Sequence, residues 1–180
     1  MSLTFPKRVK LVQEDHTLAC QLIAAYPVFR HDGEVLKEFS RLTQKNCRQL
    51  FESGIERYEH AIHIQYSMRK VPDKVLVAAS QTSSTTAAIL MLPELVRERA
   101  IPDMFRPKSA TLPNFPVIVY DGDILSTRTT FQLFVEGTLL TSVEDLTSAV
   151  WNMFAAYWVF NMTYAKRMTS TFTLLERLFF

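Results

Sequence analysis

The chain has 180 residues, 48% hydrophobic and 21% charged, a balance that can fill the core of one domain or two small ones. Lys and Arg number 20 against 18 Asp and Glu, so the formal net charge is +2. A protein whose main task is to coat duplex nucleic acid would be far more basic. The sequence holds only four glycines, which disfavours a glycine-rich loop around a nucleotide phosphate.

The two cysteines, Cys20 and Cys47, stand far apart, and neither belongs to a CxxC pair. The sequence therefore predicts no disulfide framework, and a reducing compartment is expected. The first ten residues, MSLTFPKRVK, lack the apolar core of a signal peptide, which favours an intracellular location, cytoplasmic or nuclear. Free cysteines are commonly small buried hydrophobes, and no local signature marks either one as a nucleophile.

Residues 1–78 are predicted to form a helical region. Apolar residues recur at helical spacing over residues 16–26, 34–43 and 46–68, and prolines stop the first and the last of these stretches. The second stretch has one apolar stripe, as an amphipathic helix would. Residues 75–77 predict either a short strand or the start of a helix.

Residues 79–114 are predicted to be a linker with a short helix. The polar sequence QTSSTT is followed by a helical pattern over residues 87–99. Pro93 is expected to divide that helix in two, because a proline ring blocks the normal hydrogen bond inside a helix. Four prolines between residues 101 and 116 then predict an extended connector.

In the third region, residues 115–180, the apolar period changes to two. The run of β-branched and aromatic residues in PVIVYDG predicts a strand that ends in a turn. TTFQLFVEGTLL, residues 129–140, predicts a second strand, which Gly137 ends. Its side chains Phe131, Leu133 and Val135 are expected to share one face.

Two helices are predicted to follow, over residues 143–160 with Ser142 as the N-cap, and over residues 166–179. Residues 147–165 carry no charge, but their Asn and Thr side chains are costly in lipid, so a buried or interface helix is expected and no membrane. The predicted fold is a mainly helical α+β domain. It comprises a helical N-terminal half, a proline-rich connector, and a β-hairpin packed on two C-terminal apolar helices, together one composite domain.

The helix over residues 143–160 is apolar nearly all round, which leaves two roles open. It could be the central helix of the core, or part of it could also contact another chain, since aromatic residues and Met are enriched in interface cores. The second helix adds its own apolar stripe. The candidate interaction residues on these two helices are Trp151, Phe154, Trp158, Phe172, Leu175 and Phe179.

Local basic clusters suggest a second kind of partner, nucleic acid. Candidate phosphate contacts are Lys7, Arg8, Lys10, Arg69, Lys70 and Lys74, with Tyr66 close to the second cluster in sequence. Acidic residues offset most of these charges across the whole chain, so an ordinary solvated surface is the alternative interpretation.

Metal chemistry is the third hypothesis. Asp121 and Asp123 form a DxD at the end of a strand, and with Glu136 they could hold Mg²⁺ for phosphoryl transfer. The alternative is a plain turn, where Asp and Gly supply the backbone geometry. His60 and His63 are three residues apart on a predicted helix, but this is not HExxH, and no third zinc ligand is evident.

The C-terminal segment carries a resemblance. A strand ending in VEG, an apolar helix ending in FNMTY, and a helix with an aromatic residue and a Leu pair follow one another; YPVFRHDGEVLKEFSRLTQKN upstream matches too. These motifs resemble a group of largely uncharacterised vertebrate proteins, mostly from fish, some labelled sterile-alpha-motif-domain-containing. The chain departs from the group at Ala165, where proline is usual. No sterile alpha motif is visible in the sequence itself.

The resemblance implies no enzymatic reaction. It suggests an origin in mobile elements, with coat-like or nucleic-acid-associated roles. Together with the residues, it favours a non-enzymatic module for protein–protein interaction or self-assembly, without a cofactor. Nucleic-acid association and metal-dependent phosphoryl transfer are the alternatives.

Overall fold

The computed structural model describes residues 2–68, 83–125 and 129–179, and it confirms a mainly helical α+β fold. The helices are α1 (Phe5–Gln13), α2 (Ala19–Ala25), α3 (Glu34–Thr43), α4 (Cys47–Ser67), α6 (Ser84–Leu95), α7 (Ile101–Met104), α8 (Leu146–Val159) and α9 (Thr169–Phe179), with 3-10 turns η1 (Ser2–Thr4) and η2 (Pro27–Arg30). The strands are β1 (Phe105–Pro107), β2 (Val117–Tyr120), β3 (Phe131–Val135) and β4 (Thr138–Val143).

The four strands form one mixed sheet in the order β1-β2-β3-β4. β1 runs parallel to β2, and the other neighbours are antiparallel. β1 lies within the segment that the sequence predicts as an extended connector. Pro107 ends it, and proline is tolerated there because β1 is an edge strand.

The β3–β4 hairpin turns at Glu136 and Gly137, both with positive φ, 49° and 73°. Two successive residues with positive φ characterise the type I′ turn, whose twist matches that of the paired strands. Phe131, Leu133 and Val135 are buried on one face of β3, as the alternation predicts.

The start of α8 differs from the sequence prediction. Ser142 lies inside β4, and the helix begins four residues later, where the Asp145 carboxylate accepts a 2.7 Å hydrogen bond from the Ser148 backbone N–H. In β4 the side chain of Ser142 is exposed between the buried Thr141 and Val143, so the strand period continues past the predicted cap.

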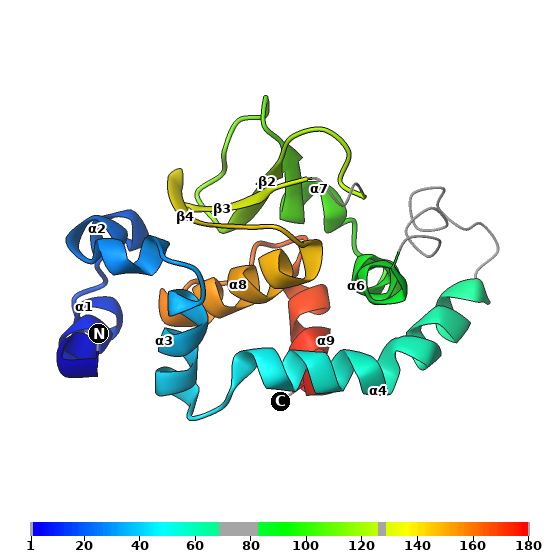
Figure 1. Cartoon of the computed structure of the whole chain (residues 1–180), viewed down its shortest axis with the longest axis horizontal. Coiled ribbons are helices and arrows are strands. Elements are labelled where there is room, and N and C mark those ends of the chain that lie inside the picture. The colour runs from blue at the N-terminus through cyan, green and yellow to red at the C-terminus, as the bar shows by residue number, and fades with distance from the viewer. Residues whose placement is uncertain (1, 69–82, 126–128, 180) are drawn as a thin grey trace.

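α8 is the central helix of the molecule. In Figure 1 it lies between the sheet on one side and α3 and α4 on the other. Every residue from Ala149 to Tyr157 is buried. Packing on several sides explains why this helix is apolar nearly all round.

The helices of the N-terminal half follow the predicted stretches closely. α3 matches residues 34–43, and α4 starts at the Asn46 N-cap, whose side chain accepts a 3.2 Å hydrogen bond from the Gln49 backbone N–H. α1 was not predicted, and residues 75–77 lie outside the described residues. One hydrophobic core extends from Val12 to Leu175. The division into three regions stays a prediction.

α6 continues through Pro93, where the sequence predicts a break. The proline lies two residues before the last residue of the helix, and all residues from Ala87 to Pro93 are buried. Packing on all sides of this short helix therefore outweighs the one hydrogen bond that the proline removes.

Candidate functional site

Most of the predicted interaction residues lie inside the core. Trp151, Phe154, Phe172 and Leu175 are at most 2% exposed. Trp151 stacks on Phe51 with ring centroids 4.0 Å apart, and Phe154 stacks on Phe172 at 5.9 Å. In this conformation these four side chains join α4, α8 and α9 to one another. The side chain of Phe179 lies outside the described residues.

Trp158 is the exception, because 39% of its surface is exposed at the C-terminal end of α8. Its indole makes an edge contact with Phe39, with centroids 5.9 Å apart. Its Nε1–H donates to the Tyr164 hydroxyl at 3.1 Å, and that hydroxyl donates to Glu176 at 2.5 Å. This chain of hydrogen bonds fixes the orientation of an indole that is partly open to solvent.

Tyr164 is well placed to keep its proton. Burial raises the pKa of its hydroxyl above the ordinary value, and the Glu176 carboxylate that accepts its hydrogen bond raises it further. The hydroxyl thus stays a donor to Glu176 throughout the physiological range and accepts from the indole. The arrangement orients Trp158.

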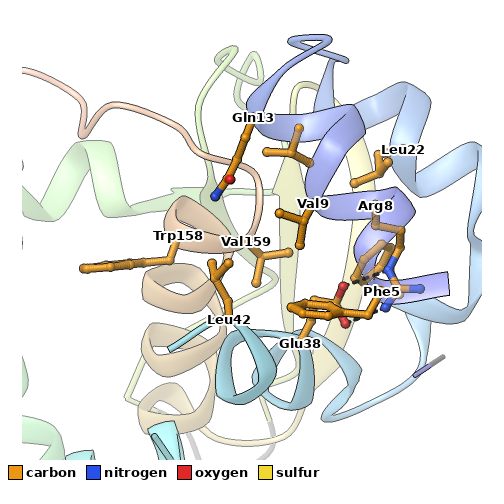
Figure 2. A pocket seen from close by; sticks show the side chains of 11 residues that line it. Phe5, Arg8, Val9, Gln13, Leu22, Glu38, Leu42, Trp158 and Val159 are labelled. Atoms are coloured by element: carbon orange, nitrogen blue, oxygen red, sulfur yellow. Dashed lines mark hydrogen bonds and ion pairs between the residues drawn. The ribbon is translucent and has the colours of Figure 1, made fainter. Parts of the chain in front are cut away.

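Side chains from α1, α3 and α8, Trp158 among them, line a small cavity near the surface. We call Val9, Gln13, Leu42 and Trp158 the tryptophan face. Figure 2 shows them around a small cavity, with the indole pointing away from the other lining residues. The cavity measures about 20 Å³, enough for a single water molecule and too small for an organic ligand.

Arg8 lies beneath this face, so its predicted role as a phosphate contact is wrong. It is 1% exposed, and its guanidinium holds both carboxylate oxygens of Glu38 at 2.7 Å. It also donates to Thr4 and lies over the rings of Tyr26 and Phe29. Two parallel charge-assisted hydrogen bonds fasten α1 to α3.

Of the other cations in the nucleic-acid hypothesis, two lie among the described residues and three lie outside them. Lys7 and Lys10 are exposed on α1. Lys10 approaches Glu14 at 3.9 Å, as a weak surface pair. Arg69, Lys70 and Lys74 lie outside the described residues. The structure therefore leaves α1 with two exposed lysines from the predicted cluster.

The three carboxylates of the metal hypothesis do not converge. Asp121 and Asp123 follow the end of β2, next to the start of β3, whereas Glu136 follows the opposite end of β3. Asp121 pairs with Lys108 at 3.2 Å, Asp123 accepts from the Leu125 backbone N–H at 3.0 Å, and Glu136 accepts from the Cys20 backbone N–H at 3.0 Å. Over residues 2–68, 83–125 and 129–179, no group of three His, Cys, Asp or Glu side chains could hold a metal ion.

A serine, a histidine and a carboxylate do meet where α4 packs on α6. His63 Nε2 lies 3.2 Å from Ser84 Oγ, and Ser84 Oγ donates to Glu59. In a nucleophilic triad the carboxylate orients the histidine, but here it accepts from the serine itself and from Thr85. The cluster joins the N-terminal turn of α6 to α4 and lacks the order of a catalytic triad.

Both cysteines are free thiols. Cys47 is fully buried, and burial raises the pKa of its thiol to about 12. Burial, and next the nearby Glu136 carboxylate, also raise the pKa of the Cys20 thiol. A thiol is nucleophilic as the thiolate, so neither environment activates its cysteine.

Glu98 caps the N-terminus of α9, a structural role that the sequence did not indicate. Its oxygens accept hydrogen bonds of 2.7 Å from the backbone N–H groups of Ser170 and Thr171, at the start of α9. Burial opposes ionisation of the group, but these bonds outweigh it and hold the pKa of Glu98 below its ordinary value. Glu98 lies 72 residues before Ser170 in the sequence, so no local pattern predicts this cap.

For Glu38, in contrast, the sequence contained a pattern that could have indicated a buried ion pair. It lies on the apolar stripe of α3, three residues after Val35 and four before Leu42. A carboxylate on a core-facing stripe needs a buried cation as its partner. That partner, Arg8, lies on α1 within a stretch that was not predicted as a helix.

Among the residues that the structure describes, no helix is both long enough and apolar enough to cross a lipid bilayer. α8, which carries most of the uncharged stretch noted in the sequence, has 14 residues. Apart from Trp158, its apolar side chains are buried under the sheet and under other helices of the same chain.

Comparison with known proteins gives one distant similarity. The chain is 24% identical to human sterile alpha motif domain-containing protein 3 over an alignment of 191 residues. The alignment covers 100% of this chain and 36% of that protein, so the chain spans about a third of the length of the relative it matches. No protein-family model and no solved structure matches the chain. The similarity agrees with the resemblance noted in the sequence, at the level of a sterile-alpha-motif-domain-containing protein.

Proposed function

We propose that this chain is a non-enzymatic module for protein–protein interaction, and that it self-associates through the tryptophan face. The observation that carries the proposal is the exposure of Trp158. The other described interaction candidates are buried, whereas Trp158 is held at the surface by hydrogen bonds to Tyr164 and, through it, to Glu176.

Energetic reasons favour such a contact. Tryptophan is among the residues that contribute most binding energy at interfaces, because its ring buries a large area with few rotatable bonds. The indole here is already oriented, so little side-chain entropy would be lost on binding. Val9 and Leu42, both half-buried, add apolar area beside it.

The distant relative supports the same class of function. Human sterile alpha motif domain-containing protein 3 is named for a sterile alpha motif, and this chain, in which no such motif is visible, aligns with 36% of it. The likeness to a group of fish proteins and the mobile-element origin remain hypotheses from the resemblance alone. An intracellular location, cytoplasmic or nuclear, is proposed on the absence of a disulfide framework in the sequence.

Light scattering on a size-exclusion column tests the proposal, with the chain at about 10 and about 200 μM, a range that covers binding free energies of roughly 5 to 7 kcal/mol. We expect a defined oligomer at the higher concentration, and a monomer for Trp158→Ser. Ile64→Ser is the matched control, since Ile64 is a large apolar residue of similar exposure, 42%, on α4.

Two results would contradict the proposal. One is a monomer at every concentration. The other is an oligomer that Trp158→Ser leaves intact, which would move the contact to another face. Following the absorbance of nucleic acid in the same runs separates the alternative partner, because a nucleic-acid complex would dissociate steeply in salt.

A further inference from the structure

A hollow at the β1 edge of the sheet is lined mostly by apolar side chains. It lies where α6, α7, β1, the end of β2 and the connection between α8 and α9 meet, and its volume is about 620 Å³. Leu90 and Phe105 in its lining are buried, and Ile101, Tyr120 and Ile124 are half-buried. It shares no described lining residue with the tryptophan face. We call this feature the edge hollow.

Three charged side chains stand at the edge hollow. They are Asp103 of α7, Arg106 of β1 and Arg167 of the connection between α8 and α9. Asp103 is the one carboxylate among the described lining residues, and the two guanidinium groups share it. Its oxygens lie 3.6 Å from Arg106 Nη2 and 4.0 Å from Arg167 Nε, and both distances exceed that of a hydrogen bond. The described lining therefore carries an excess of one positive charge.

The guanidinium of Arg106 is only partly used by the fold. The side chain is 27% exposed, and its Nη1 donates a 2.8 Å hydrogen bond to the Thr111 backbone C=O. Among the residues that the structure describes, its Nε is covered and has no hydrogen-bond partner. A covered donor without a partner is unfavourable, so an acceptor beside it would be stabilising. Nε and Nη2 together form an edge that fits the two oxygens of a carboxylate.

We infer that the edge hollow binds a small apolar molecule that carries one carboxylate, such as an aryl or alkyl carboxylic acid. The ligand carboxylate pairs with Arg106 and Arg167, so that two cations face two carboxylates. The apolar body of the ligand covers Leu90, Phe105 and Ile124. The volume lies within the range of about 300 to 1,000 Å³ of small-ligand sites, which are mostly apolar with a few polar groups. The function proposed above does not depend on this site.

The backbone of β1 disfavours a peptide strand as the occupant. A strand that extends a sheet is held by backbone hydrogen bonds along the free edge. The Phe105 N–H already donates to the Ile101 C=O. Pro107 has no N–H, and its C=O accepts a 2.9 Å hydrogen bond from the Ala110 N–H. Because these groups are already paired or missing, a ligand held by side chains is favoured.

Calorimetric titration with 1-naphthylacetate tests the inference, because this probe joins an apolar ring system to one carboxylate. Two further probes separate the contributions of its parts. 1-Naphthylacetamide has the same ring system without the charge, and acetate has the charge without the ring system.

The variants remove one contact each. Arg106→Gln removes the guanidinium edge. Arg167→Gln removes the second cation at an exposed position, where substitution scarcely changes stability, and Ile124→Ser removes apolar lining while both cations stay. Arg57→Gln, on the exposed side of α4, removes the same charge away from the hollow and is the matched control. Circular dichroism checks that each variant is folded.

We expect 1-naphthylacetate to bind the wild type. Affinity should fall at least about tenfold for the amide probe and for Arg106→Gln, from the loss of charge-assisted hydrogen bonds. Arg167→Gln should weaken binding about threefold, as an exposed ion pair would. Ile124→Ser should weaken it through the lost apolar area, and Arg57→Gln should leave it unchanged.

No binding to the wild type, or equal affinity for the acid and its amide, would overturn the inference. So would acetate that binds as tightly as 1-naphthylacetate, or equal weakening in Arg57→Gln and Arg167→Gln. The probe comparison and Arg167→Gln decide the matter if Arg106→Gln does not fold. A peptide ending in phenylalanine that binds more tightly than 1-naphthylacetate would overturn the small molecule in favour of a protein C-terminus. Trp158→Ser should bind normally, so failure of self-association and failure of this site can be told apart.

Discussion

Arg8 and Glu38 show at the residue scale how a charged pair can replace apolar packing. Both are buried, at 1% and 4% exposure, and each satisfies the other through two hydrogen bonds. Removing Arg8 takes two charge-assisted hydrogen bonds from the buried Glu38 carboxylate and leaves it the one from Arg41 at 2.8 Å, whereas replacing both members by apolar residues of similar size removes the two buried charges. The pair also lies close to Trp158, because both residues line the cavity beside the tryptophan face.

Arg8→Met is therefore expected to destabilise the fold by about 2 to 3 kcal/mol in urea denaturation, because Arg41 still pairs with the Glu38 carboxylate. Arg8→Met/Glu38→Met is expected to recover most of that loss. The control is Lys10→Met, a solvent-exposed position on the same helix, with a change below about 0.5 kcal/mol. A double variant as unstable as the sum of its two single variants would contradict this description of the pair.

Glu98 gives the fold a dependence on pH. Its pKa is held below the ordinary value of 4.5, so the stabilisation that it supplies to α9 is complete above that value and is lost as the pH falls through the lower, folded-state pKa. We expect Glu98→Ala to cost about 1 to 2 kcal/mol near neutral pH, from the loss of a cap.

Urea denaturation of Glu98→Ala and wild type, repeated at falling pH, is the measurement. The difference in the free energy of unfolding should shrink below the ordinary pKa of the carboxyl group. Glu14→Ala, at an exposed carboxylate, should change stability little at any pH. A difference for Glu98→Ala that stays constant down to strongly acid conditions would count against the cap.

At the scale of elements, the predictable parts were those whose signals are local. The apolar residues at helical spacing in α3 and α4 lie within the helices that they specify, so both helices were found. The start of α8 was misplaced because Ser142, followed by two acidic residues, looks like a helix N-terminus. Pairing with β3, a tertiary effect, extends β4 through that position.

The difference can be tested by substituting both candidate caps. Asp145→Ala is expected to destabilise by about 1 kcal/mol, because it removes the acceptor of the Ser148 N–H. Ser142→Ala, on the exposed side of β4, should change stability by less than about 0.5 kcal/mol. Thermal denaturation followed by circular dichroism distinguishes the two variants. A larger loss of stability for Ser142→Ala than for Asp145→Ala would favour Ser142 as the N-cap, as predicted from the sequence.

At the scale of the whole molecule, the sequence pointed to the helix that carries the proposed contact but could not separate core from surface on it. Trp151, Phe154 and Trp158 look alike as apolar residues on one side of a helix. Which of them stays exposed depends on what packs around α8: α4 and α9 cover the first two, and the end of the helix leaves the third partly open. Arg8 was misjudged for the same reason, since its partner lies 30 residues away.

The fluorescence of Trp158 measures the proposed interface directly. The chain has two tryptophans, and Trp151→Phe keeps the stacked contact with Phe51 while leaving Trp158 as the sole indole. Over the concentrations where light scattering shows growth in mass, we predict that the emission of Trp158 shifts to shorter wavelength and that quenching by iodide weakens, because the indole leaves water. Emission and quenching that stay constant while the mass grows would place the contact elsewhere and contradict the account.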